Sequence, residues 1–392
     1  MSGNDTPEVD ILVIGGGING VGTAQAAAAA CHSVLLVEQN TIASATSSNS
    51  TKLIHGGLRY LESMQMGLVY EALHERETLL KLAPGLVSRE WFYIPVFRHN
   101  KRPAWVVNIG LALYWALSVG RSRFKSVPRK QWQHVIPGLN TEHMTTLLAY
   151  EDAATDDALL TQAVARSAER LGATIQQHTA FVGASFQDNR WLIQLAPDGQ
   201  NQKTEVRAKI LINATGPWVN TVRQQITPLP PEQKIHLVQG THLLLDRPCP
   251  AFVYVESEDD RVMFFRPWKG GTLAGTTETD FYGDPSKVHA SKEEVKIILA
   301  TYNRYFPEHP CSKSDILEYY CGIRVLPQYS DTAFSANRSA MLVCDNEDKP
   351  SYIAIYGGKL TTYRKEAEKV ARLISRRLPA KQNADTGKIS LT

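Results

Sequence analysis

A glycine-rich turn close to the N-terminus constrains the fold of this chain more than any other feature. It lies in residues 9–22, which read VDILVIGGGINGVG. The apolar first half is typical of a strand that is buried on both faces of a parallel sheet. Gly15, Gly17 and Gly20 then form the pattern G-x-G-x-x-G, in which a tight turn, close approach of a pyrophosphate and helix packing each require one glycine. The segment therefore predicts an α/β fold with a Rossmann-like dinucleotide site.

The residues after this turn complete the pattern. An alanine-rich helix is expected there, and its N-terminal amides and dipole attract phosphate groups. A second strand, SVLLVEQ, ends at Glu38, at the distance where an acidic residue binds the ribose hydroxyls of adenosine. An acid at this position disfavours a 2′-phosphorylated nucleotide. The expected cofactor contacts here are Gly15, Gly17, Ile18, Asn19, Gly20, Glu38 and Gln39.

Two later segments repeat the order of strand and glycine turn. Residues 208–220 read AKILINATGPWVN, and residues 352–374 read YIAIYGGKLTTYRKEAEKVARLI. The second continues into an amphipathic helix, whose N-terminus could stabilise the negative charge of a reduced flavin. A nicotinamide has no such need, so the pattern favours FAD and one discontinuous FAD-binding domain. Further expected FAD contacts are Val182, Ala214, Thr215, Gly216, Gly358, Lys359, Leu360 and Thr361.

Two stretches interrupt this nucleotide framework. Within the second, short β-like runs such as AFVYVES and GTLAGTT alternate with turns, which predicts an antiparallel sheet that roofs the flavin. Substrate would lie between this roof and the flavin. The sequence therefore predicts an α+β protein overall. We assign residues 1–89, 143–225 and 318–392 to the FAD-binding domain, and residues 90–142 and 226–317 to a substrate or cap domain.

Charge and cysteine content restrict the possible ligands. The formal net charge of +3 over 392 residues gives no support for a nucleic-acid-binding protein. The five cysteines form no CxxC pair, so neither a zinc site nor an iron–sulfur site is expected, and no other metal is predicted. Reduced thiols and the lack of a secretory signal pattern point to the cytoplasm.

One apolar run has two possible explanations. Residues 104–119 read AWVVNIGLALYWALSV, which is shorter than the about 20 residues that a spanning helix needs. Basic residues flank it on both sides, as in helices that lie in one membrane leaflet and are attracted by anionic lipid. A helix buried against the core is the equal alternative.

Several motifs together resemble a known family. They are GGGINGVG, TSSNSTKLIHGGLRYLE, RPAWVVNIGLALY, TDDALL, NATGPWV, GTTETDFYGDP, CGIRVLP and YGGKLTTYRKEAE. From Asp10 to Arg377 the chain resembles the FAD-dependent, respiratory glycerol-3-phosphate dehydrogenases, and the single-subunit membrane-associated type more than the anaerobic one. It departs from the family in lacking the usual C-terminal helical domain, which puts oligomerisation and membrane docking in doubt.

The resemblance implies an activity and a location. The expected reaction is oxidation of sn-glycerol 3-phosphate to dihydroxyacetone phosphate by hydride transfer to FAD, with the electrons passed to membrane quinone. The expected place is the cytoplasmic side of the inner membrane, where the protein would associate peripherally with the anionic lipid surface. A homodimer would also be compatible with the family.

Three cations are the candidates for the substrate phosphate. Arg59, Arg324 and Lys359 each lie in or just after a glycine turn (HGGLR, CGIR, GGK), although a surface salt bridge is the alternative for each. The resemblance implies that Arg59, Tyr60 and Lys359 contact substrate and that Arg324 lies near the reacting oxygen. Because arginine does not deprotonate in proteins, we expect Arg324 to act electrostatically.

Two histidines are candidates for proton transfer. His242 lies in the strand LVQGTHLLL, and its spacing there fits a buried core residue as well as it fits a base. Its position in the family resemblance favours the base, for which we expect a pKa near the working pH. His55 is expected to position the flavin. In the loop before it, small side chains are placed to bond the flavin diphosphate and ribityl chain, and the expected contacts are Thr46, Ser47, Ser48 and Leu53.

Two other functions share these features. An FAD-dependent oxidase, acting on glycerol 3-phosphate or on an amine or amino acid, would have the same fold but would pass electrons to oxygen. A catalytically silent FAD-binding protein would use the apolar helix to attach to a membrane or a partner. The cations and histidines above argue against the silent protein.

Overall fold

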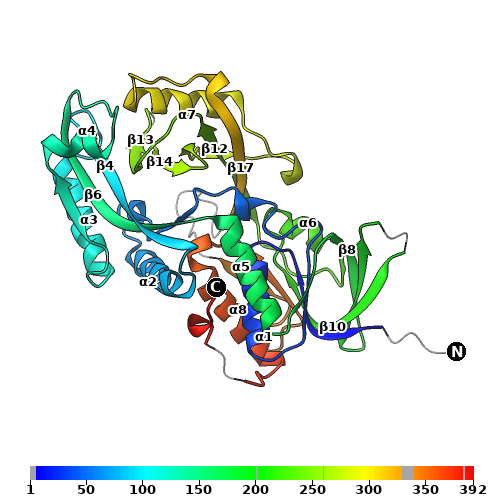
Figure 1. Ribbon diagram of the computed structural model, residues 1–392. Helices are drawn as coiled ribbons and strands as arrows, with labels where there is room; N and C mark the ends of the chain where they lie inside the picture. The colour runs from blue at the N-terminus through cyan, green and yellow to red at the C-terminus, as the bar shows by residue number, and fades with distance from the viewer. Residues whose placement is uncertain (1–5, 200–201, 259, 329–339, 383–384) are drawn as a thin grey trace.

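Two sheets organise the computed structural model, which describes residues 6–199, 202–258, 260–328, 340–382 and 385–392. Figure 1 shows the N-terminal helix α1 (Ile18–Ala29) beside α5 (Asp157–Arg170) and α8 (Tyr363–Arg377), below a second group of strands that includes β12, β13, β14 and β17. The chain passes between the two sheets several times, so each sheet combines segments that are distant in sequence.

The first sheet carries the predicted parallel framework. Its central strands are parallel, and an antiparallel hairpin extends one side. Within the described residues it has nine strands. They are β1 (Glu8–Ile14), β2 (Val34–Val37), β7 (Thr174–Gln176), β8 (Thr179–Gln187), β9 (Arg190–Pro197), β10 (Thr204–Asn213), β11 (Ile226–Thr227), β18 (Met341–Cys344) and β19 (Tyr352–Tyr356).

The three predicted glycine turns follow adjacent strands of this sheet. Ile14 at the end of β1 lies opposite Asn213 of β10, and Asn213 lies opposite Ala354 of β19. The turns therefore leave the sheet at one edge, as ligand-binding loops of parallel sheets do. This confirms the expectation of a single, discontinuous nucleotide framework.

Small side chains allow α1 to pack tightly on both sides. Almost every residue of α1 is buried, between α5 and α8. A Cβ at Gly22 would lie only 2.7 Å from the ring of Tyr363, so glycine is what lets α8 approach. The side chain of Asp156 caps α5 by accepting a hydrogen bond from Leu159 N at 3.0 Å.

The second sheet is largely antiparallel, and it changes the predicted domain boundaries. β6 pairs with β4 along its length and β17 pairs with β12, although residues 143–155 and 318–327 were assigned to the FAD-binding domain. The strands to which a segment is paired along its length, and not its position in the sequence, decide to which sheet the segment belongs. The ten strands within the described residues are β3 (Leu53–Ile54), β4 (Val87–Phe97), β5 (Phe124–Val127), β6 (Met144–Thr155), β12 (Ile235–Leu245), β13 (Phe252–Glu256), β14 (Val262–Trp268), β15 (Gly271–Gly275), β16 (Thr279–Asp280) and β17 (Ile316–Pro327).

The apolar run at 104–119 forms the helix α3 (Ala104–Leu117), which is not buried in the core. Only Leu111 and Tyr114 of this helix are buried, whereas Trp105 is 65% exposed and Ile109 is 60% exposed. One face of α3 thus packs on the core while the opposite face is exposed, so the helix is only partly buried. Among the described residues, none of the helices has the length and hydropathy to span a bilayer. The other helices are α2 (Met66–Leu82), α4 (Trp132–Val135), α6 (Val219–Arg223) and α7 (Lys292–Tyr305).

Candidate active site

A cavity of about 690 Å³ lies where the two sheets meet. Its walls come from the three glycine turns of the first sheet, from the segment 43–60, and from strands β12, β14 and β17 of the second sheet. Most of the residues expected at cofactor or substrate line it: Gly15, Gly17, Ile18, Asn19, Glu38, Gln39, Thr46, Ser47, Leu53, His55, Arg59, Tyr60, Ala214, Thr215, Gly216, His242, Arg324, Gly358, Lys359, Leu360 and Thr361.

The glycine turn after β1 has the close packing that its spacing predicts. Gly15 has a φ of +107°, and a Cβ on it would lie 2.7 Å from the carbonyl oxygen of Ala214. A Cβ at Gly20 would lie 1.9 Å from the carbonyl oxygen of Gly15. Gly20 therefore holds α1 against the turn, and it is not among the residues that line the cavity.

The first turn of α1 opens onto the cavity. The backbone N–H of Ile18 donates to Ser47 Oγ at 3.0 Å, so the serine hydroxyl remains able to donate to a phosphate. The side-chain amide of Asn19 donates to the carbonyl of Gly357 at 2.8 Å and ties this turn to the one after β19. Its Oδ1 is buried and has no partner within the described part of the chain. A buried acceptor of this kind, beside a helix N-terminus, fits a ligand that brings donors.

Glu38 lies at the end of β2, as the sequence predicts. Its carboxylate accepts hydrogen bonds from Gly16 N at 2.6 Å and Asn40 N at 2.9 Å. Glu38 lines the cavity, and each of its oxygens can accept a further hydrogen bond, so ribose hydroxyls could still bind it.

Two further expected contacts lie away from the cavity. The Ser48 hydroxyl donates to the carbonyl of Ala45 at 3.1 Å, because the short helical turn at 46–48 points it back into its own loop. In β8, Thr179 and Phe181 line the cavity, whereas Val182 does not. The pairing of β8 with β9 shifts register between Phe181 and Gly183, so Val182 lies at an irregularity of the strand that the sequence pattern does not reveal.

The three expected cations meet in one part of the cavity. Arg324 on β17 pairs with Glu278 at 2.7 Å, and Arg59 approaches the same carboxylate at 3.5 Å. The ammonium of Lys359 lies 4.1 Å from the centre of the Tyr60 ring. Glu278 lies in the motif GTTETDFYGDP, but no feature of the sequence distinguishes it from the other acids of the chain.

The two histidines have different surroundings. His55 lines the cavity, and its backbone N–H donates to Thr361 Oγ1 at 3.2 Å. His242 on β12 is only 2% exposed, and its Nε2 lies 2.9 Å from the hydroxyl of Thr51. Thr51 is not among the residues that the sequence predicts at the site. Burial lowers the pKa of both imidazoles. Positive charge on Arg324, Lys52 and Arg266 lowers that of His242 further, to about 3. The expectation of a pKa near the working pH is therefore wrong for His242, because the imidazole is buried and three cations lie near it.

Comparisons with known proteins agree on one family. Residues 10–364 match the model of the FAD dependent oxidoreductase family. The aerobic glycerol-3-phosphate dehydrogenase of Escherichia coli is 37% identical over 92% of this chain and 72% of that protein, and the D-erythritol 1-phosphate dehydrogenase of Brucella abortus is 34% identical over the same shares. The solved structure of the Bacillus halodurans glycerol-3-phosphate dehydrogenase complexed with FAD is 27% identical, with a TM-score of 0.78 over 98% of this chain and 67% of that one.

Proposed function

The chain belongs to the FAD-dependent oxidoreductase family and groups there with the glycerol-3-phosphate dehydrogenases, and on this basis we propose that it oxidises sn-glycerol 3-phosphate to dihydroxyacetone phosphate and passes the electrons to membrane quinone. The observation that carries the proposal is the cavity itself. Two arginines, a lysine and two histidines line it next to three glycine turns that admit a dinucleotide.

FAD fits the residues of this cavity. The backbone at Gly15 and Gly17, the hydroxyl of Ser47 and the N-terminus of α1 would hold the diphosphate, and Glu38 would hold the ribose. A Cβ at Gly17 would come within 3.3 Å of Ser47 Oγ and would narrow this cradle. Bound FAD supplies the acceptor for the hydride of the substrate C2 carbon.

The cations would bind and orient the substrate. Arg59 and Lys359 would take the phosphate, because a guanidinium offers paired donors and an ammonium a compact charge. Arg324 would stabilise the negative charge that develops on the C2 oxygen. A dianionic phosphate is a stronger partner for these groups than the single carboxylate of Glu278, so substrate would displace that pairing.

His242 would take the proton from the C2 hydroxyl. Its depressed pKa keeps the imidazole deprotonated at neutral pH, so a nitrogen lone pair is available. The substrate phosphate would offset the positive charge of Arg324 and raise the basicity of the ring. His55 would lie next to the flavin and would position it.

A second cavity supports the quinone as acceptor. Its volume is about 280 Å³, and Leu61, Met66, Val107 and Leu113 are among the apolar residues on its walls. It shares Leu58 and Tyr254 with the larger cavity, and α3 forms one side. An apolar quinone ring could reach the neighbourhood of the flavin by this route. The exposed apolar face of α3 and its basic flanks would lie on the anionic cytoplasmic membrane surface from which the quinone comes.

Anaerobic titration tests the whole proposal. The purified protein with bound FAD should lose its oxidised-flavin absorbance when sn-glycerol 3-phosphate is added, and a soluble quinone should restore it. D-Erythritol 1-phosphate, amino acids and amines are the comparison substrates. A flavin that glycerol 3-phosphate does not bleach would refute the dehydrogenase and favour the silent binding protein. Hydrogen peroxide formed in air, in equal amount to product and without quinone, would favour the oxidase.

A further inference from the structure

The proposed base lines the cavity but is almost fully enclosed. His242 is 2% exposed, and its Nδ1 is both enclosed and without a hydrogen-bond partner in the described part of the chain. Its Nε2 has one partner, the hydroxyl of Thr51 at 2.9 Å. Thr51 is only half-buried and lines the cavity. The threonine hydroxyl therefore connects the enclosed imidazole to the substrate space.

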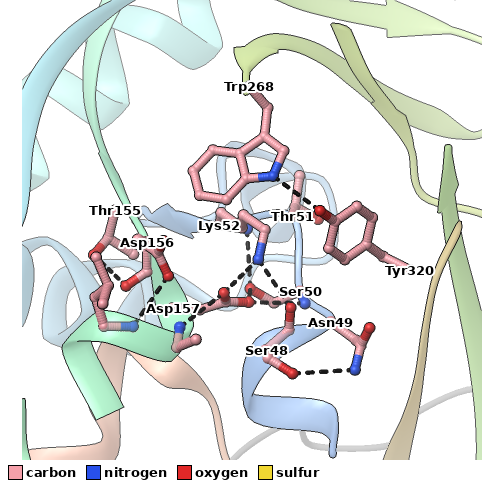
Figure 2. A network of polar contacts seen from close by, with 12 residues as sticks. Ser48, Asn49, Ser50, Thr51, Lys52, Thr155, Asp156, Asp157, Trp268 and Tyr320 are labelled. Carbon is pink, nitrogen blue, oxygen red and sulfur yellow. Dashed lines mark hydrogen bonds and ion pairs between the residues drawn. The ribbon is translucent and has the colours of Figure 1, made fainter. Parts of the chain in front are cut away.

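The two residues on either side hold Thr51 in place. The backbone N–H and the hydroxyl of Ser50 both donate to Asp157 Oδ2, at 2.9 and 2.7 Å. The ammonium of Lys52 pairs with Asp157 Oδ1 at 2.5 Å. Figure 2 shows this carboxylate, at the first turn of α5, between the two neighbours of Thr51. One buried acid thus anchors the backbone before and after the threonine.

The anchor itself is well enclosed. Lys52 is 2% exposed and also donates to the carbonyl of Ser48 at 2.8 Å. Its ammonium lies 4.8 Å from the centre of the Trp268 ring, which is above it in Figure 2, and 5.1 Å from that of the Tyr320 ring, which is beside it. A buried ion pair with its remaining donors satisfied resists rearrangement, since removal of one partner leaves an uncompensated charge.

We propose that Thr51 is a catalytic residue that relays the substrate proton to His242. In this step the O–H bond of the substrate C2 hydroxyl breaks as a new O–H bond forms on Thr51 Oγ1. The original proton of Thr51 passes to Nε2 of His242, where an N–H bond forms. The C2 hydride leaves for FAD with its electron pair, and the C2 oxygen becomes a carbonyl. This relay rests on the proposed function, and it adds Thr51 to His242 as a second group that carries the substrate proton.

Two substitutions at one position test the relay. Thr51→Val removes the hydroxyl at nearly constant volume, whereas Thr51→Ser keeps it. With each FAD-loaded variant, the rate of flavin bleaching by glycerol 3-phosphate is measured under anaerobic conditions in a rapid-mixing instrument. We expect Thr51→Val to slow bleaching about 100-fold, at the lower end of what general acid–base catalysis contributes, and Thr51→Ser to retain most of the rate. The dissociation constant of dihydroxyacetone phosphate, read from the shift in flavin absorbance, should change little.

A matched control and a double variant separate this role from a structural one. Thr301→Val also removes a buried hydroxyl, one that donates to the carbonyl of Ile297 on α7, and should bleach as the wild type does. His242→Gln should slow bleaching, and adding Thr51→Val to it should cost little more, because both act on one proton.

The outcomes distinguish the relay from the activity. The relay would be overturned, and the proposed function kept, if Thr51→Val bleached at the wild-type rate. The same would follow if the two substitutions had independent effects in the double variant. If Thr51→Val fails to fold, Thr51→Ala gives the same comparison. A wild-type flavin that glycerol 3-phosphate does not bleach would refute the proposed function, and the relay with it.

Discussion

The carboxylate of Glu278 lies 2.7 Å from the guanidinium of Arg324. It also lies 3.5 Å from Arg59, so one acid, in the loop between β15 and β16, contacts both of the arginines that the sequence assigns to the substrate. These arginines thus have an internal anionic partner before substrate arrives. A phosphate ligand must compete with it.

Substitution of this acid should strengthen phosphate binding. In Glu278→Gln the neutral amide competes less for the two arginines, so we expect the dissociation constant of dihydroxyacetone phosphate to fall about three- to tenfold, which corresponds to about 0.7 to 1.4 kcal/mol. Arg59→Ala should raise the same constant. Asp280→Asn, which removes the charge of an acid that pairs with His236, is the control. Weaker binding by Glu278→Gln would instead mean that the acid orients the guanidinium groups.

A side chain at Gly20 should prevent the close approach of α1 to the preceding glycine turn and so abolish FAD binding. In Gly20→Ala the new methyl group would lie 1.9 Å from the carbonyl oxygen of Gly15, so α1 must move away from the diphosphate cradle. The measurement is the ratio of FAD to protein after gel filtration. Gly67→Ala on α2, where a Cβ meets nothing within 4 Å, should keep full FAD content. Normal FAD content in Gly20→Ala would contradict the role given to this glycine.

The buried imidazole should make the protein less stable in acid. The pKa of His242 is about 3 in the folded chain, against about 6.5 when unfolded. Between about pH 3 and about pH 6.5 the unfolded chain binds more protons than the folded chain, so the free energy of unfolding increases with pH. As the pH falls below about 6.5, this free energy decreases by up to about 1.4 kcal/mol per pH unit. Urea unfolding with saturating FAD at pH 5, 6 and 7 should therefore show a weaker pH dependence for His242→Gln. The exposed His309, changed to Gln, serves as control. An equal pH dependence in wild type and His242→Gln would rule out this contribution.

The exposed face of α3 should carry the attachment to lipid. Replacement of Trp105 and Ile109 by Ser removes two large apolar side chains from that face without touching the core. We expect the double variant to float less with vesicles that contain anionic phosphatidylglycerol. Leu229→Ser removes an apolar residue that is 59% exposed elsewhere and should float as the wild type does. Equal flotation of all three proteins would refute the assignment of α3.

Much of the nucleotide framework is predictable because its signals are local. The turn at Gly15 to Gly20, the acid at Glu38 and the later glycine turns each depend on a few consecutive residues, whose backbone requirements are visible in the sequence. The structure brings these turns to one edge of a parallel sheet. The helix at 104–117 is also predictable from its local sequence. The exposure of its side chains is not, because burial depends on which distant segments pack against the helix.

The parts that the sequence left open depend on pairing between distant segments. The register of β6 with β4 and of β17 with β12 moved the domain boundaries. A register shift in β8 at Val182 and a short helical turn at Ser48 kept these two residues out of the cavity lining. The sequence by itself determined the cofactor cradle and the kinds of residue near the substrate. Only the tertiary structure decided that Glu278 would meet Arg324, that Thr51 would meet His242, and that burial and three nearby cations would lower the pKa of that histidine. Such contacts join side chains far apart in the chain, and their distances and burial exist only once the sheets have formed.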